Sequence, residues 1–355
     1  MELRAAYSAQ TPELKTLLAG SIARALAVYC VDEVVVFDDS PSLKSDSDDT
    51  PRDHFTGYDD PSYFLLHILS YLESPPFLRT RLFPIHPDLR HAGLLPSLDM
   101  PHHLRANEIC PYREGISVKD DAEGQETEQQ IGIGDAKAKK KKRKPKTHEG
   151  GNVEIETETT HLVDVGYPNP VRTAALVPLD NRVTVHFSDP NSPDTTATIV
   201  DPSDPRIEDG YYWGYTPRIA SSISSVLTEC PFPGGYDITL GTSERGKPLT
   251  QLRGLNPKSN PTDGIYLNGG VESETPSTSM IPPFQHLLVA FGGISGLEPA
   301  VGSDPVLREK DIETKELFDF WVDVCPGQGS RTIRTEEAIW IALAQLKEIV
   351  DANGY

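Results

Sequence analysis

Apolar residues recur at helical spacing in three parts of the chain, and this pattern predicts three long helices. The first helix begins at Pro12, with Thr11 as its N-cap. The second runs over Pro61–Glu73 with Asp60 as its cap, and the last begins near Thr335. The positions expected to face inward are Leu14, Leu17, Leu18, Ile22, Ala25 and Leu26 in the first helix, Phe64, Leu65, Ile68, Leu69 and Leu72 in the second, and Ile339, Ala342, Leu343, Leu346, Ile349 and Val350 in the last.

Short apolar runs between these helices are typical of strands that are buried on both faces of a parallel sheet. They are "EVVVFDD" from Glu33 to Asp39, "YDITL", "HLLVAF" and "LFDFWVDV". Thr216 and Pro217 are expected to open a further helix, with Ile219, Ile223, Val226 and Leu227 on one face. The alternation of helices and strands predicts the α/β fold class.

The middle of the chain has a different pattern. The runs "EGISV", "HLVDV", "TAALVPL", "RVTVHF" and "TATIV" are short and separated by turn residues, which predicts a small β-barrel. We therefore expect an inserted domain at 112–207, which splits the α/β domain into residues 1–111 and 208–355.

Charge is distributed unevenly. The 355-residue chain has a net charge of −20, yet Lys137–Lys146 ("KAKKKKRKPK") holds eight basic residues and leaves about −28 on the rest. This run lies in a charge-blocked, low-complexity loop at 118–160 that we expect to be disordered, like the acidic stretch after Asp39 and the polar insertion after Arg245. A basic run in an acidic chain indicates a nuclear localisation signal or a nucleic-acid tether, and hence a nuclear or nucleolar protein. The alternative is a solvated linker without a partner.

Several classes of protein and site are disfavoured. No run reaches the roughly 18 apolar residues of a membrane helix, and the N-terminus lacks the apolar part of a signal peptide. The four cysteines are scattered, and GxGxxG, GxxxxGK[ST], HExxH and GxSxG are all absent. His86, His91, His102 and His103 do not have zinc-ligand spacing with Cys110, so we expect surface or core histidines and no metal.

Three strands of the C-terminal half end in glycine-rich loops: "LGTSERG" (Leu240–Gly246), "FGGISG" (Phe291–Gly296) and "CPGQGSR" (Cys325–Arg331). Ligands of open parallel sheets bind beyond the carboxyl ends of the strands, and glycine lets a backbone approach a ligand closely. One such loop is most simply a turn, but three together favour a ligand site.

Arg331 and Arg334 directly precede the last helix, where the positive end of the helix dipole disfavours cations. Thr335 can cap that helix, and Glu336 and Glu337 suit its first turn. The arginines therefore indicate contacts with a carboxylate or phosphate, or else an internal salt bridge to these glutamates or to Asp323.

Taken together, these loops resemble those of the SPOUT class of methyltransferases, which have a trefoil knot and use S-adenosylmethionine. "QGSRTIRTEEA" is similar to the "LGxRILRTETA" block of bacterial rRNA uridine-N3 methyltransferases, and "FGGISGLE" to their "GPEGG" loop. The eukaryotic SPOUT-domain RNA methyltransferase family resembles the chain more closely. Its motifs are matched by "CVDEVVVFDD", "HAGLLPSLDMPHHLR", "REGI", "YYWGYTPRIASSIS", "GYDITLGTSERG", "VAFGGISGLE" and "CPGQGSRTIRTEEAI".

The resemblance implies a knotted α/β domain, an inserted OB-like β-barrel and a homodimer with the cofactor cleft near its interface. It also implies that S-adenosyl-L-methionine is the cofactor. Thr242 and Ser243 would lie at the edge of the cleft, and Gly292 and Gly293 would approach the ribose or methionine part. The adenine would be wrapped by Val324, Cys325, Pro326, Gly327, Gln328, Gly329, Ser330, Arg331, Thr332 and Ile333.

The reaction implied is methylation of an rRNA base, most simply N3 of a uridine. An arginine could stabilise the anion formed when N3 loses its proton, and the candidates are Arg24, Arg331 and Arg334. Glu336 and Glu337 are weaker candidates for the base. Two alternatives remain: a SPOUT enzyme that methylates arginine in a protein, and a non-catalytic RNA-binding or spindle-associated factor.

Overall fold

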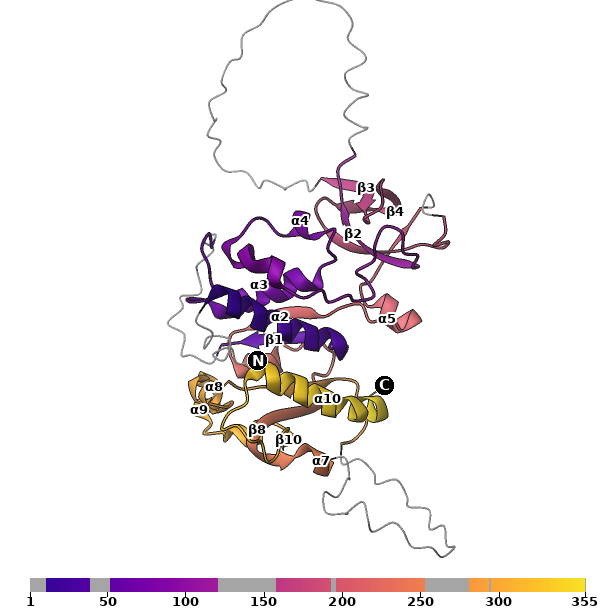
Figure 1. The fold of residues 1–355 in the computed structure, drawn as a ribbon. Helices are drawn as coiled ribbons and strands as arrows, with labels where there is room; N and C mark the ends of the chain where they lie inside the picture. The colour runs from indigo at the N-terminus through magenta and orange to yellow at the C-terminus, as the bar shows by residue number, and fades with distance from the viewer. Residues whose placement is uncertain are drawn as a thin grey trace, which may run out of the picture. The chain divides into compact units, whose positions relative to one another are not determined.

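The computed structural model describes residues 11–38, 52–120, 158–192, 196–252, 281–293 and 295–354. The basic run Lys137–Lys146, most of the predicted acidic loop and most of the insertion after Arg245 lie outside the described residues. The chain forms two compact units (Figure 1). The first comprises Met1–Ser74, Phe83–Asp99 and Gly214–Tyr355, and the second comprises Pro75–Leu82 and Met100–Trp213.

The strands of the first unit pair only in parallel within the described residues. β1 (Glu33–Phe37) pairs with β7 (Thr216–Ala220). β8 (Ile238–Pro248) lies between β10 (Phe320–Asp323) and β9 (Leu287–Ala290), so the last strand lies on the far side of β8 from β9. One apolar core joins both groups of strands to the short helices; it contains Val35, Phe37, Ala220, Ile223, Val226, Ala290, Leu297, Ala300, Val301, Leu307 and Phe318.

The three predicted long helices are confirmed as α2 (Pro12–Val28), α3 (Pro61–Glu73) and α10 (Thr335–Asn353). The predicted caps of α2 and α3 are also present, since Thr11 Oγ1 accepts the main-chain N–H of Leu14 and Asp60 Oδ1 that of Tyr63. Helix α2 packs against α3 and α10 (Figure 1). The shorter helices are η1 (Pro87–Leu94), α6 (Ile223–Thr228), α7 (Leu249–Leu252), α8 (Glu298–Ser303), α9 (Pro305–Glu309) and η2 (Thr314–Leu317). Among the described residues, no helix is both long and apolar enough to cross a bilayer.

Three local predictions for this unit were wrong. Thr216–Ala220 is a strand, because it pairs along its whole length with β1, and the helix begins only at Ile223 with Ser222 as its cap. Leu14 and Leu17 are 49% and 43% exposed, since the first turns of α2 bury Lys15, Thr16 and Ala19 instead, and Val350 of α10 is 39% exposed. Strand β8 continues through the predicted polar loop to Pro248, and its pairing with β10 shifts register between Gly241 and Lys247.

The second unit is a five-stranded antiparallel sheet in the order β4-β3-β2-β5-β6. The five predicted runs supply its strands: β2 (Tyr112–Ser117), β3 (Thr159–Asp164), β4 (Val171–Pro178), β5 (Arg182–His186) and β6 (Thr198–Val200). The sheet is nearly closed into a barrel, because Ala197, just before β6, donates to the carbonyl of Arg172 on β4 at 2.8 Å. Two helices accompany it, α4 (Arg79–Leu82) and α5 (Asp204–Asp209).

This unit extends beyond 112–207, the bounds expected for the inserted domain. The buried Arg113 donates at 2.6 Å to the carbonyls of both Arg105 and Glu108, which fixes the stretch before β2 to the sheet. Leu78 packs with Ile116 of the sheet, which accounts for the segment Pro75–Leu82. Neither segment has an apolar period that would assign it to a β-domain.

Candidate active site

The three glycine-rich segments lie on neighbouring parallel strands of the first unit or directly after them. Residues 242–246 lie within β8, where its pairing with β10 shifts register. β9 ends at Ala290 before Gly292, and β10 ends at Asp323 before the loop at 324–334. Since the carboxyl ends of parallel strands lie at one edge of a sheet, the fold brings these loops together.

The loop after β9 is closed by main-chain contacts. Gly296 has φ of +81° and donates to the carbonyl of Gly293 at 3.0 Å. A β-carbon on Gly292 would overlap the main chain of Gly296 and Leu297. Gly292 is thus required for a close approach of two backbone segments.

Three side chains, one from β8 and two from α10, hold the loops in place. The hydroxyl of Thr242 donates to the carbonyl of Ala290 at 2.8 Å, which ties β8 to the end of β9. The hydroxyl of Thr335 donates to the carbonyl of Gly292 at 3.3 Å. From α10, the side-chain amide of Gln345 donates to the carbonyl of Val324. These hydrogen bonds connect the three glycine-rich segments to one another and to α10.

The loop after β10 presents its backbone to its surroundings. Gly327 has φ of +75°, and a turn closes there because Gln328 donates to the carbonyl of Cys325 at 3.2 Å. Within the part of the chain that the structure describes, the main-chain N–H groups of Gly329, Ser330, Arg331 and Ile333 have no hydrogen-bond partner. This loop therefore offers several donors that a ligand could use.

The two arginines of this loop are exposed, and neither guanidinium has a hydrogen-bond or ion-pair partner among the described residues. The internal salt bridge considered as an alternative is therefore not seen there. Arg334 itself is the N-cap of α10, and its main-chain N–H donates to Glu337 Oε2 at 2.9 Å. The prediction that Thr335 caps this helix was wrong, because Thr335 is its first residue and its hydroxyl bonds Gly292.

The remaining candidate residues differ in whether their side chains already have hydrogen-bond partners. Glu336 is only 8% exposed, and no described residue bonds its carboxylate, whereas Glu337 is used by the helix cap. Arg24 on α2 donates to the carbonyls of Ser97 and Leu98 at 3.2 and 2.8 Å. Its guanidinium thus secures the segment that follows η1.

The roles of three residues at this site were not predicted. Gln345 is a polar residue on the flank of α10 next to the buried Leu346, and an apolar period gives no sign of such a residue. The carboxylate of Asp323 accepts the N–H of Cys325 at 2.9 Å and shapes the start of its loop. A β-carbon on Gly246 would overlap the main chain of Val322, so this glycine permits the register shift of β8 against β10.

Comparison with known proteins decides the family. A family model described as "Putative RNA methyltransferase" matches residues 5–346 of the chain. The chain belongs to this family of RNA methyltransferases. This confirms the family resemblance inferred from the motifs, and with it the assignment of the chain as a methyltransferase.

Named relatives align with this methyltransferase over most of its length. It is 39% identical over 348 residues to the human protein named 28S rRNA (uridine-N(3))-methyltransferase. This alignment covers 96% of this chain and 74% of the human protein. The mouse protein of the same name is 38% identical, with coverage of 96% and 73%. The Drosophila melanogaster protein of that name is 38% identical over 350 residues, with coverage of 96% and 59%.

Proposed function

We propose that this methyltransferase transfers a methyl group from S-adenosyl-L-methionine to N3 of a uridine in the RNA of the large ribosomal subunit. The observation that carries the proposal is the joined set of three glycine-rich loops, in a chain that is 38–39% identical to proteins named for this reaction. The family membership supports RNA as the substrate class.

The loop after β10 suits the adenine and ribose of the cofactor. Its N–H groups that lack a partner among the described residues can donate to ring nitrogens and hydroxyls. Apart from the adjacent residues, no described residue lies within 4 Å of a β-carbon placed on Gly327 or Gly329. Thr242 and Ser243 would border the methionine part, next to Gly292 and Gly293. When bound, S-adenosylmethionine would supply an electrophilic methyl group.

The chain's own residues then have to make N3 nucleophilic. N3 of uridine carries a proton at neutral pH, and its removal leaves negative charge on the flanking carbonyl oxygens. The free guanidinium groups of Arg331 and Arg334 can stabilise that charge. The carboxylate of Glu336 can accept the proton, which would leave the N3 lone pair available to the electrophilic methyl group that the cofactor would supply. We place Arg24 outside this chemistry, in the role of fixing the segment at 97–98.

Larger-scale features extend the proposal. We propose that β8, β9 and β10 with their loops form a trefoil knot. Two observations support this: β10 lies on the far side of β8 from β9, and the backbone at Gly246 lies against that of Val322. We propose an OB-like role in RNA binding for the nearly closed barrel, because such barrels commonly bind oligonucleotides. We also propose that the protein is a homodimer located in the nucleus or nucleolus. Lys137–Lys146 would serve as a targeting signal or as an RNA tether.

A labelling experiment tests the proposal against its alternatives. The purified chain is incubated with methyl-labelled S-adenosylmethionine and either protein-free large-subunit rRNA from cells lacking the gene or the proteins of the same subunits. We expect label in the RNA and, after digestion, in 3-methyluridine. Label in arginine of a protein would contradict RNA as the substrate, and absence of cofactor binding by calorimetry would favour a non-catalytic factor.

A further inference from the structure

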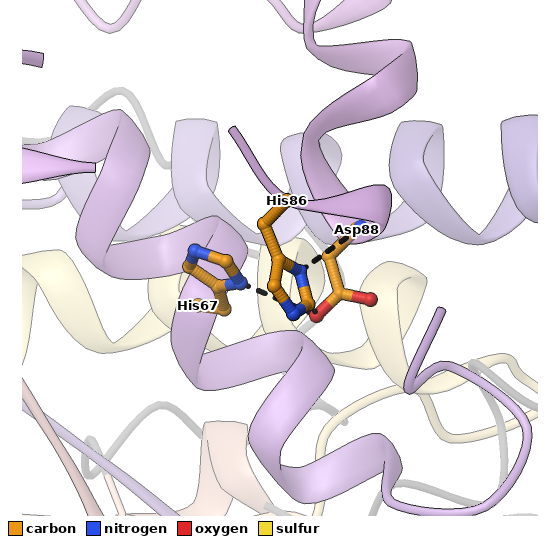
Figure 2. A group of neighbouring side chains, drawn as sticks. All are labelled: His67, His86 and Asp88. Carbon is orange, nitrogen blue, oxygen red and sulfur yellow. Dashed lines mark hydrogen bonds and ion pairs between the residues drawn. The ribbon is translucent and has the colours of Figure 1, made fainter. Parts of the chain in front are cut away.

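Three side chains of the first unit, none of them from the glycine-rich loops, converge on one another. They are His67 of α3, His86 just before η1, and Asp88 within η1 (Figure 2). Asp88 Oδ2 lies 3.2 Å from His67 Nδ1 and 3.3 Å from His86 Nδ1, and one ligand atom of each of the three residues lies within 4.8 Å of the others. Asp88 is completely buried, and the two histidine side chains are only 11% and 13% exposed.

Hydrogen bonds determine the protonation state of His86. Its Nε2 lies against the carbonyl oxygen of Arg52, which can only accept, so Nε2 carries a proton. Its Nδ1 accepts the main-chain N–H of Asp88 at 3.2 Å, so Nδ1 holds a lone pair. A lone pair of His86 therefore faces a carboxylate oxygen across 3.3 Å. Two such atoms repel each other unless a cation lies between them.

We propose that His67 Nδ1, His86 Nδ1 and Asp88 Oδ2 bind one divalent transition-metal ion of the zinc type. Ligand bonds of about 2.0–2.1 Å in a tetrahedral site place neighbouring ligand atoms about 3.3 Å apart. The two separations from Asp88, 3.2 and 3.3 Å, match this edge. The third edge, between the two histidine nitrogens, would have to reach the same length when the ion binds. Imidazole with one carboxylate favours zinc over magnesium or calcium.

The surroundings of the cluster are those of a metal site. Metal-bound histidines usually donate their other N–H to a carbonyl, as His86 does to Arg52. Bound carboxylates are usually hydrogen-bonded as well, and Asp88 accepts the N–H and the hydroxyl of Thr56 at 2.8 and 2.7 Å. Coordination would replace the long bond from the N–H of Asp88 to His86, which is a small loss. The ion would join the segment at Arg52 and Thr56 to α3 and η1.

The test uses the full chain, freed of metal with a chelator and titrated with zinc chloride in a calorimeter. We expect one ion per chain and a zinc-dependent rise in the melting temperature. His67→Gln should weaken binding by at least about tenfold, because one ligand is replaced. Thr56→Val, which keeps the shape but loses the hydroxyl bond to Asp88, should weaken it by about 10–100-fold.

His91→Gln is the matched control, since His91 lies on the same η1 but pairs with Glu13 at 3.4 Å outside the cluster. This variant should bind zinc as the unaltered chain does. The proposal is overturned if the unaltered chain binds no zinc, or if His67→Gln and Thr56→Val bind it with unchanged affinity. A melting temperature that responds to pH between 5 and 7 but not to zinc would also overturn it, because the cluster would then hold a proton.

Discussion

Some residues at the loop junctions can be recognised from the sequence, and others cannot. Glycine at the end of a strand was a sufficient signal for Gly292 and Gly327, because few other reasons place glycine there. Gln345 gave no comparable signal, since its role depends on the carbonyl of Val324, 21 residues away in the chain. Long-range contacts of this kind cannot be predicted from local spacing.

Gly292→Ala should disrupt the loop after β9, which we propose to contact the cofactor. Its β-carbon would overlap the main chain of Gly296, and relief of that overlap should cost about 1–3 kcal/mol of unfolding free energy. Urea unfolding and calorimetric titration with S-adenosylmethionine measure both effects. Gly302→Ala on α8 is the control, because a β-carbon there meets nothing within 4 Å and should leave stability unchanged or raised. Equal behaviour of the two variants would contradict the loop's assigned role.

Arg334→Ala should impair the reaction and leave the fold intact. The guanidinium is exposed and has no partner among the described residues, so the free energy of unfolding should change by less than about 0.5 kcal/mol. Loss of one charge-stabilising donor should lower kcat by about 10²–10³-fold. Arg308→Ala, at another exposed arginine on α9, should retain full activity. An active Arg334→Ala enzyme would remove this arginine from the mechanism.

At the scale of elements, contacts between neighbouring residues were easier to predict than pairing between distant segments. Thr11 and Asp60 cap α2 and α3 as expected, because a cap requires only residues within three positions. Thr216–Ala220 was assigned to a helix, because Thr-Pro is a common helix start and the strand partner, β1, lies more than 180 residues earlier. Pairing with that partner outweighs the local preference.

Asp304 should make the junction of α6 and α9 sensitive to acid. Burial raises the pKa of this carboxyl, but bonds from Ser224, Ser222 and the N–H of Leu307 lower it more, and the net result is a lowered pKa. A lowered pKa contributes stability above the unfolded value of about 3.9, and this stability is lost as the pH falls through the folded value.

The matching variant is Asp304→Asn. It should lose about 0.5–2 kcal/mol of unfolding free energy at pH 7, because the N–H groups of Val306, Leu307 and Ser224 lose a charged acceptor. The difference from the unaltered chain should shrink below pH 4, which urea unfolding at both pH values can measure. An equal difference at the two pH values would show that the charge of Asp304 is not what matters.

At the scale of the whole molecule, the change of period from helical runs to short turn-bounded runs was enough to predict an α/β domain with a β-module in the middle of the chain. The exact extent of the module was not predictable, because Met100–Pro111 joins it through the buried Arg113 and has no period of its own. The order β10-β8-β9 was likewise beyond local patterns, since it is set by contacts between distant segments.

The central claim is that this chain methylates N3 of a uridine in the RNA of the large ribosomal subunit. The most direct measurement is mass spectrometry of nucleosides from that RNA, purified from cells that lack the gene and from the same cells supplied with the unaltered chain or with Arg334→Ala. We predict that 3-methyluridine disappears without the gene, returns with the unaltered chain and does not return with Arg334→Ala. An unchanged amount of 3-methyluridine in cells that lack the gene would contradict the claim.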